Sequence, residues 1–207
     1  MKKVLVFLII SAMFSLGCSA ARSLYVTDQY EKNPLKMNKR IIVVGKAPSS
    51  STKLSGLVTD MFADLVKQRK NYIVYGKAPY TNQWQQKCNA KVTGVMLLEV
   101  VRYKIKSGSV QLKMEVSQYD CTTKKVLWVV SGEGSWNSNQ SHLKELIAQY
   151  KEKYGNSSRT FTGPVFNLIT EILKVIPDPK LTEDESDTKI DVEAFSPGVK
   201  IERRFYM

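Results

Sequence analysis

Histidine and cysteine are scarce in this chain of 207 residues. His142 is the only histidine, and the cysteines stand far apart at Cys18, Cys88 and Cys121. Because zinc sites need several Cys or His ligands at short spacings, the sequence predicts no metal site. Long apolar runs are missing too: the uncharged stretch over residues 4–14 is shorter than the roughly 20 residues that cross a bilayer. This disfavours a transmembrane anchor.

Familiar catalytic patterns are missing as well. There is no Gly-x-Ser-x-Gly motif and no phosphate-binding glycine loop. His142 is better interpreted as an exposed helix residue than as a general base. Glu99 could form a carboxylate pair with Glu115 or Glu133, but basic neighbours in its strand favour a structural ion pair. We therefore expect no enzyme, no catalytic residue and no cofactor.

The first seventeen residues have the features of a secretory signal peptide. Two lysines precede an apolar stretch, and small residues follow it. Leu16-Gly17-Cys18 resembles a lipobox, in which a peptidase cuts before a cysteine that carries diacylglycerol, although Ser15 stands where an aliphatic residue is usual. We expect cleavage between Gly17 and Cys18 and a lipid anchor, palmitate included, on Cys18. The alternative is ordinary cleavage, for instance after Ala20.

Positive charge exceeds negative charge, with a net +12 over the chain. Residues 18–176 carry a net +13, whereas residues 177–207 hold eight acidic and five basic residues. A cytosolic protein with this surplus would suggest nucleic acid, but an exported chain does not, and we expect no nucleic-acid partner. Anionic lipid headgroups, acidic glycans and an acidic protein remain open, as does a basic surface that only aids solubility.

Hydrophobic periodicity predicts the elements of one domain. A strand over 40–45, an amphipathic helix over 54–66 and a strand over 71–76 indicate a βαβ unit, whose two strands should be parallel. Three strands within 92–134 follow as an antiparallel meander. Helices over 141–154 and 164–173 come last. The expected class is α/β (α+β), with a mixed sheet of about five strands and helices packed on it.

These elements divide the chain into four parts. Residues 1–17 are the signal peptide, 18–39 a lipidated tether and lead-in, 40–176 the α/β domain, and 177–207 an acidic tail that we expect to be disordered because apolar residues are sparse.

Two pairs of residues stand out within the domain. A turn at Ser107-Gly108 would bring Cys88, before the first meander strand, beside Cys121, after the second. An even pair in an oxidising compartment favours a disulfide, and the alternative is two unpaired thiols. Trp84 and Trp136 fall in polar loops, where they could mark a contact surface or pack over the edge of the core.

The domain resembles a small α/β module of envelope lipoproteins. Four segments carry the resemblance: Arg40 to Val44, Leu54 to Val66, Thr93 to Leu98, and Tyr119-Asp120-Cys121-Thr122-Thr123-Lys124-Lys125-Val126-Leu127-Trp128. The last is similar to a Tyr-Asp-x-x-Thr-Gly-x-x-Leu-Trp pattern, with Lys124 in place of the glycine. The module occurs in the TolB amino-terminal region, the curli secretion lipoprotein CsgG and the penicillin-binding-protein activator LpoB, and the chain is also similar to uncharacterised lipoproteins of Leptospira and myxobacteria.

The resemblance implies a non-enzymatic module in the cell envelope, most simply on the outer membrane, that binds an envelope protein or a cell-wall partner. A pore like that of CsgG is not expected, because the domain lacks a pair of long amphipathic hairpins. The alternative is a surface-exposed, adhesin-like lipoprotein whose basic domain captures acidic glycans or host ligands. A hydrolase would need paired carboxylates around Glu99.

Overall fold

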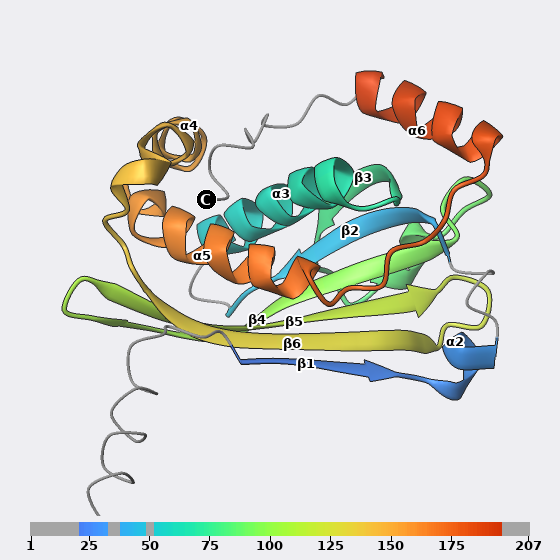
Figure 1. Cartoon of the computed structure of the whole chain (residues 1–207), viewed down its shortest axis with the longest axis horizontal. Coiled ribbons are helices and arrows are strands. Elements are labelled where there is room, and N and C mark those ends of the chain that lie inside the picture. Colours follow the sequence, from blue (N-terminus) through green and yellow to red (C-terminus); the bar gives the residue numbers. More distant parts are fainter. Residues whose placement is uncertain (1–20, 33–37, 49–51, 196–207) are drawn as a thin grey trace, which may run out of the picture.

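The computed structural model describes residues 21–32, 38–48 and 52–195. Within these ranges the chain forms six strands and several helices (Figure 1). In chain order they are β1 (Ala21–Val26), α2 (Asp28–Lys32), β2 (Arg40–Lys46), α3 (Thr52–Arg69), β3 (Ile73–Pro79), the 3-10 turn η2 (Trp84–Lys87), β4 (Gly94–Lys106), β5 (Ser109–Asp120), β6 (Val126–Asn137), the 3-10 turn η3 (Ser141–Leu143), α4 (Lys144–Tyr154), α5 (Ser158–Leu173) and α6 (Glu183–Phe195).

All six strands form one mixed sheet in the order β1-β6-β5-β4-β2-β3. β2 is parallel to both β3 and β4, which confirms the βαβ unit, and β4, β5 and β6 form the predicted antiparallel meander. The predicted fold class is therefore confirmed, with six strands in place of about five.

The additional strand is β1, which lies in the segment we interpreted as a tether. It pairs antiparallel with β6, from Ala21 opposite Glu133 to Val26 opposite Trp128. Without β1, the long strand β6 would leave its backbone donors and acceptors unpaired along an exposed edge. The pairing with β6 makes this part of the expected tether a strand.

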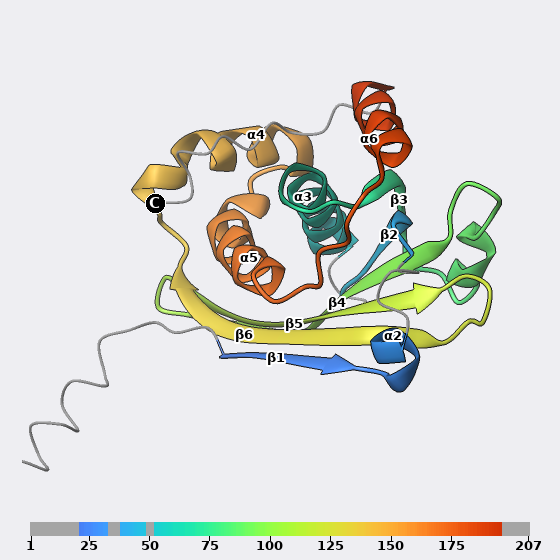
Figure 2. The ribbon, with the colours of Figure 1, turned by 45° about the vertical axis from the view of Figure 1, so that its right-hand side comes forward.

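Helices α3 and α5 pack on one face of the sheet, α4 packs on these two helices, and together they enclose the main core (Figure 2). Alternate residues of β5 are fully buried there: Val110, Leu112, Met114 and Val116. Trp128 of β6 is also fully buried. No helix within the described ranges is long and apolar enough to cross a membrane.

Trp84 and the two domain cysteines lie on the opposite face of the sheet. Cys88 and Cys121 form a disulfide, with their Cα atoms 5.6 Å apart. Trp84 is only 7% exposed, and its ring centroid lies 4.5 Å from that of Tyr119. The contact-surface interpretation of Trp84 is therefore wrong, because the disulfide and η2 hold the indole against a second, smaller cluster with Val44 and Val95.

Helix α5 begins six residues before its expected start. It runs from Ser158, so that Pro164 lies inside the helix and not at its first turn. Pro164 cannot donate the main-chain hydrogen bond that a helix interior requires. Ser158 stabilises the earlier start, since its hydroxyl donates to the carbonyls of Gly155 (2.7 Å) and Tyr150 (3.1 Å).

The acidic tail is helical over Glu183–Phe195, which corrects the expectation of disorder for that part. A capping box starts α6: Glu185 N–H donates to the Thr182 hydroxyl (3.3 Å), and Thr182 N–H donates to the Glu185 carboxylate (2.8 Å). Glu185 also pairs with Lys39 at 2.7 Å, and Lys189 donates to the Lys70 carbonyl at 2.6 Å. These polar contacts, and not apolar burial, hold α6 on the domain.

Candidate binding pocket

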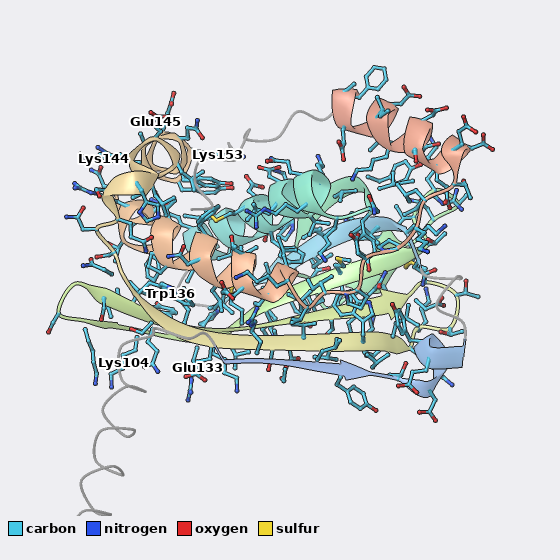
Figure 3. All side chains as sticks on the ribbon, in the orientation of Figure 1. Lys104, Glu133, Trp136, Lys144, Glu145 and Lys153 are labelled. Carbon is cyan, nitrogen blue, oxygen red and sulfur yellow. A yellow bond between two sulfur atoms is a disulfide. The ribbon has the colours of Figure 1, made fainter. Side chains whose placement is uncertain are left out.

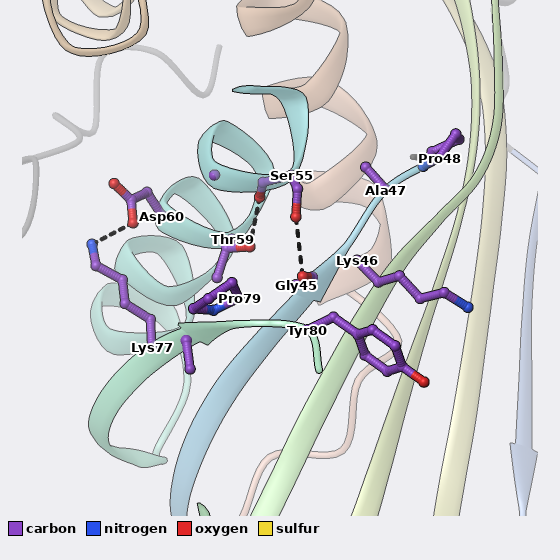
Figure 4. Close-up of a pocket in the computed structure, with 12 residues that line it drawn as sticks. Gly45, Lys46, Ala47, Pro48, Ser55, Thr59, Asp60, Lys77, Pro79 and Tyr80 are labelled. Atoms are coloured by element: carbon purple, nitrogen blue, oxygen red, sulfur yellow. Dashed lines mark hydrogen bonds and ion pairs between the residues drawn. The ribbon is translucent and has the colours of Figure 1, made fainter. Parts of the chain in front are cut away.

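A pocket of about 410 Å³ opens where the parallel strands β2 and β3 end beside the first half of α3 (Figure 4). In open α/β sheets, ligands bind outside the carboxyl ends of the parallel strands. The apolar part of the lining comes from the chain that leaves each strand: Ala47, Pro48, Ala78 and Pro79. Three charged residues also line the pocket: Asp60, Lys77 and Lys46. The place and the lining both suit a binding site.

Gly45 sets the distance between β2 and α3 at this pocket. A Cβ at Gly45 would lie 1.6 Å from Oγ1 and 2.8 Å from Cβ of Thr59. The helix comes this close because Ser55 donates its hydroxyl to the Gly45 carbonyl (3.0 Å), while Thr59 donates to the Ser55 carbonyl (2.6 Å). The same Gly45 carbonyl accepts the Tyr80 N–H at 3.0 Å. Gly45 thus sets both the distance between β2 and α3 and the position of Tyr80 at the pocket wall.

We expect Gly45→Ala to destabilise the domain by about 2 kcal/mol, because overpacking a closely packed site costs roughly 1–3 kcal/mol. For a domain of this size that corresponds to a fall of roughly 4–8 °C in Tm. The matched control is Gly76→Ala in β3, where an added Cβ meets nothing within 4 Å. Thermal unfolding of both variants checks this, and equal Tm values would contradict the close approach of α3.

Asp60 is the most densely bonded side chain at the pocket. Its carboxylate is 9% exposed and pairs with Lys77 at 2.8 Å. It also accepts hydrogen bonds from Lys153 and Tyr154, at the end of α4. Burial pushes the pKa of Asp60 upward, but the bonds from Lys153, Lys77 and Tyr154 outweigh it, so the pKa lies below its usual value. Burial, followed by the bond to Asp60, raises the pKa of Tyr154.

Asp60→Asn is expected to lower the free energy of unfolding at pH 7 by about 2 kcal/mol, less than the 3–5 kcal/mol of a fully buried pair, since both lysines reach solvent. Because the folded pKa is depressed, this stabilisation is present above the unfolded pKa of about 3.9 and is lost as pH falls through the folded pKa. Urea unfolding at neutral and acidic pH measures the difference in free energy of unfolding between wild type and variant. If this difference stays constant down to pH 2.5, ionised Asp60 does not stabilise the fold. The control is Asp187→Asn, at an exposed residue of α6.

Lys46 and Tyr80 join the pocket to the open face of the sheet. Lys46 pairs with Glu99 at 2.7 Å and lies 5.1 Å from the centroid of the Tyr80 ring. The hydrogen bond to Glu99 raises the pKa of Lys46, against the smaller effect of burial. Glu99 stands directly opposite Glu115 on β5, while Glu133 pairs with Arg102 at 2.6 Å. Glu99 and Glu133 are thus ion-paired, and none of the three acids lines the pocket.

The other predicted site residues do not meet at this pocket. Gly17 and Cys18 lie outside the described residues, so the cleavage site and the lipid anchor stay predictions. Trp136 is partly buried against the main core, and His142 is exposed in η3. Sequence reasoning missed the pocket, although a strand that ends in Gly45 before a proline-containing loop and a helix is a signal for a site at a strand's carboxyl end.

The sheet order and the helices on one face define an α/β domain whose fold is shared with PelC. The chain matches a PelC dodecamer from Paraburkholderia phytofirmans with a TM-score of 0.54 and 10% identity, over 79% of this chain and 100% of that chain. A second PelC dodecamer structure, of a point variant, matches with a TM-score of 0.51 and 13% identity, over 75% and 94%. At these identities the likeness is one of fold.

Bacterial lipoproteins also occur among the solved structures that the chain resembles. Lipoprotein GNA1162 from Neisseria meningitidis matches with a TM-score of 0.36 and 15% identity, over 55% of this chain and 95% of that chain. This is a partial similarity. No protein-family model and no curated protein matches the chain.

Proposed function

We propose that the chain is a bacterial envelope lipoprotein, anchored to the outer membrane by a lipid on Cys18, which acts as a non-enzymatic adaptor. In this proposal a segment of an envelope protein or a cell-wall partner binds in the pocket between β2, β3 and α3. The pocket itself carries the proposal: about 410 Å³ of space, beside the ends of two parallel strands, with an apolar wall and one fixed ion pair.

The lining favours recognition of an apolar segment. Binding sites are concave and mostly apolar, with a few placed polar groups. The hydroxyls of Ser55 and Thr59 donate to carbonyls of the domain itself, so their hydrogens are not offered to a ligand. Lys77 keeps about a third of its side chain exposed beside Asp60, and it can contact a polar group of the partner.

The state of Asp60 supports binding over acid–base chemistry. Its two carboxylate oxygens pair with Lys77 and Lys153, and Tyr154 donates to the second of them. With its pKa depressed, the carboxylate stays ionised near neutral pH and is a poor proton donor.

Site-specific cross-linking tests the proposal. With a photoreactive phenylalanine analogue in place of Tyr80, irradiated envelopes should give a discrete cross-linked product, and the same analogue at Asp187 of α6 should not. Ala78→Trp fills the pocket and should reduce the yield at least tenfold. Gln85→Trp adds the same bulk on exposed η2 and should leave the yield unchanged. A product that persists with Ala78→Trp would contradict binding in the pocket.

A second copy of this chain is the first partner to test. The PelC structures of the same fold are dodecamers, which supports self-association as a hypothesis. Light scattering of the purified protein in detergent would give the number of copies. A cross-linked product at twice the mass of the chain would identify the partner as another copy.

The alternative function is capture of acidic glycans by the basic domain, as in an adhesin. The observation that favours it is the net charge of +13 on residues 18–176. Capture by charge should weaken steeply between low and physiological ionic strength, because salt screens exposed charges. Binding in the apolar pocket should change little over the same range, which distinguishes the two functions.

A further inference from the structure

The β4–β5 hairpin extends beyond the body of the domain and is basic and apolar at its end. Within residues 101–111, which we call the hairpin end, there are three bases, Arg102, Lys104 and Lys106, and no acid. Val101 and Ile105 are 44% and 51% exposed. Arg102 pairs with Glu133, whereas neither lysine forms an ion pair with any residue that the structure describes. Figure 3 shows Lys104 near this end of the sheet.

A hollow with three more basic side chains adjoins the turn of the hairpin. Its volume is about 250 Å³, and its charged lining residues are Lys144, Lys151 and Arg159, all exposed. Ser138 joins the two features, because it lines the hollow while its hydroxyl donates to the Gly108 carbonyl at 2.7 Å. The acids of α4, Glu145 and Glu152, do not line it. The hairpin end and the hollow thus adjoin at the same end of the sheet, with Lys104 on the face away from the helices and the hollow on the helix side (Figure 3).

Strand β1 places the hairpin end close to the proposed anchor. Ala21 stands opposite Glu133, which stands opposite Lys113, and Lys113 stands opposite Arg102. The chain therefore enters the sheet level with the base of the hairpin end. Ala21 is three positions after Cys18, so the lipidated residue can lie no more than about 11 Å from the start of β1.

This short link limits how the domain can lie on a membrane. Arg102 lies level with Ala21 across the sheet. From Arg102 to Ser107 the hairpin extends about 17 Å further, at roughly 3.3 Å per residue. β1 itself extends about 17 Å in the opposite direction, from Ala21 to Val26. A link of about 11 Å is shorter than this 17 Å, so the end of the domain at Val26 cannot face the bilayer while Cys18 is anchored in it. The hairpin end therefore points at the membrane or lies along it.

We propose that the hairpin end and the adjoining hollow bind the anionic phospholipid headgroups of the membrane in which the chain is anchored. The inference rests on the lipid at Cys18 in the proposed function. Lys104, Lys106 and the three bases of the hollow contact headgroup phosphates, and Ile105 enters the interface between headgroups and acyl chains. A basic surface next to an acyl anchor provides a second signal for stable membrane attachment.

The test uses the full protein, isolated from bacterial envelopes in detergent and reconstituted into vesicles. An environment-sensitive fluorophore on Ser107→Cys reports on the hairpin turn, and the same label on Asn71→Cys reports on the other end of the sheet. With phosphatidylglycerol in phosphatidylcholine vesicles, the label at 107 should shift to the blue and become accessible to a lipid-bound quencher. The label at 71 should not respond, and 1 M salt should reverse the response at 107.

Charge reversal gives the matched comparison. Each lysine near an anionic surface favours the bound state about fivefold, so Lys104→Glu with Lys106→Glu should lower the bound-to-unbound ratio of the hairpin at least 25-fold. Lys87→Glu with Lys91→Glu makes the same charge change on exposed residues at the other end of β4 and should have little effect. Equal effects of the two double substitutions would overturn this inference alone. So would a label at 107 whose fluorescence does not change with phosphatidylglycerol. Protein that does not float with the vesicles would overturn the proposed anchor as well.

Discussion

Replacing Cys88 and Cys121 together by alanine is expected to lower the free energy of unfolding by about 4 kcal/mol. The two cysteines are 33 residues apart, and the chain-entropy model assigns about 4 kcal/mol to a cross-link over a loop of that size. For a domain of 150–250 residues this corresponds to a fall in Tm of roughly 8–16 °C. The variant should unfold at clearly lower urea concentration than the wild type.

The structure adds a local signature to this prediction. The disulfide borders the small cluster in which Trp84 lies against Tyr119, on the face of the sheet that the helices leave open. Loss of the cross-link should therefore expose Trp84 and shift its fluorescence to the red, while Trp128 in the main core stays buried. Trp84→Phe identifies the emission of Trp84 among those of the three tryptophans. Unfolding midpoints that do not change on removal of the cysteines would show that the disulfide does not stabilise the fold.

Cys18→Ala is expected to abolish the incorporation of labelled palmitate into the protein. A buried methylene contributes about 0.8 kcal/mol, so that several acyl chains hold a protein far more tightly than a single reversible chain. The wild-type protein should partition into the detergent phase and be shorter than the variant, which we expect to keep residues 1–17 because lipobox cleavage requires the modified cysteine.

The matched control is the Cys88 and Cys121 double variant, which should incorporate palmitate like the wild type. Mass spectrometry of the amino-terminal peptide then measures both the cleavage and the lipid on Cys18. Equal labelling of wild type and Cys18→Ala would contradict the lipid anchor. Cleavage after Ala20 in the wild type would leave an exported protein without this anchor.

Elements with a strong hydrophobic period could be predicted closely. The alternation along β5 and the apolar stripe of α3 each define a buried face from local sequence alone, because side chains in strands and helices repeat every 2.0 and 3.6 residues. The pair Cys88 and Cys121 followed from the same pattern, since the hairpin turn at Ser107 and Gly108 fixes which residues of β4 and β5 stand opposite each other.

Elements held by polar or distant contacts could not be predicted in this way. α6 depends on the capping box of Thr182 and Glu185 and on contacts to Lys39 and Lys70, which are far away in sequence. β1 is a strand because β6 offers it a free edge. Trp84 stands in a polar segment, and it is buried only because the disulfide brings that segment onto the sheet.

The sequence by itself determined the expected lipobox at Cys18, the strands and helices of the domain and the scarcity of catalytic groups, because these depend on residue type and local period. Only the tertiary structure decided that Gly45 contacts Thr59, that Asp60 meets Lys77 and Lys153, and that the start of β1 lies level with the base of the basic hairpin. Such contacts join residues from separate elements, and their distances follow from how sheet and helices pack together and not from any local pattern.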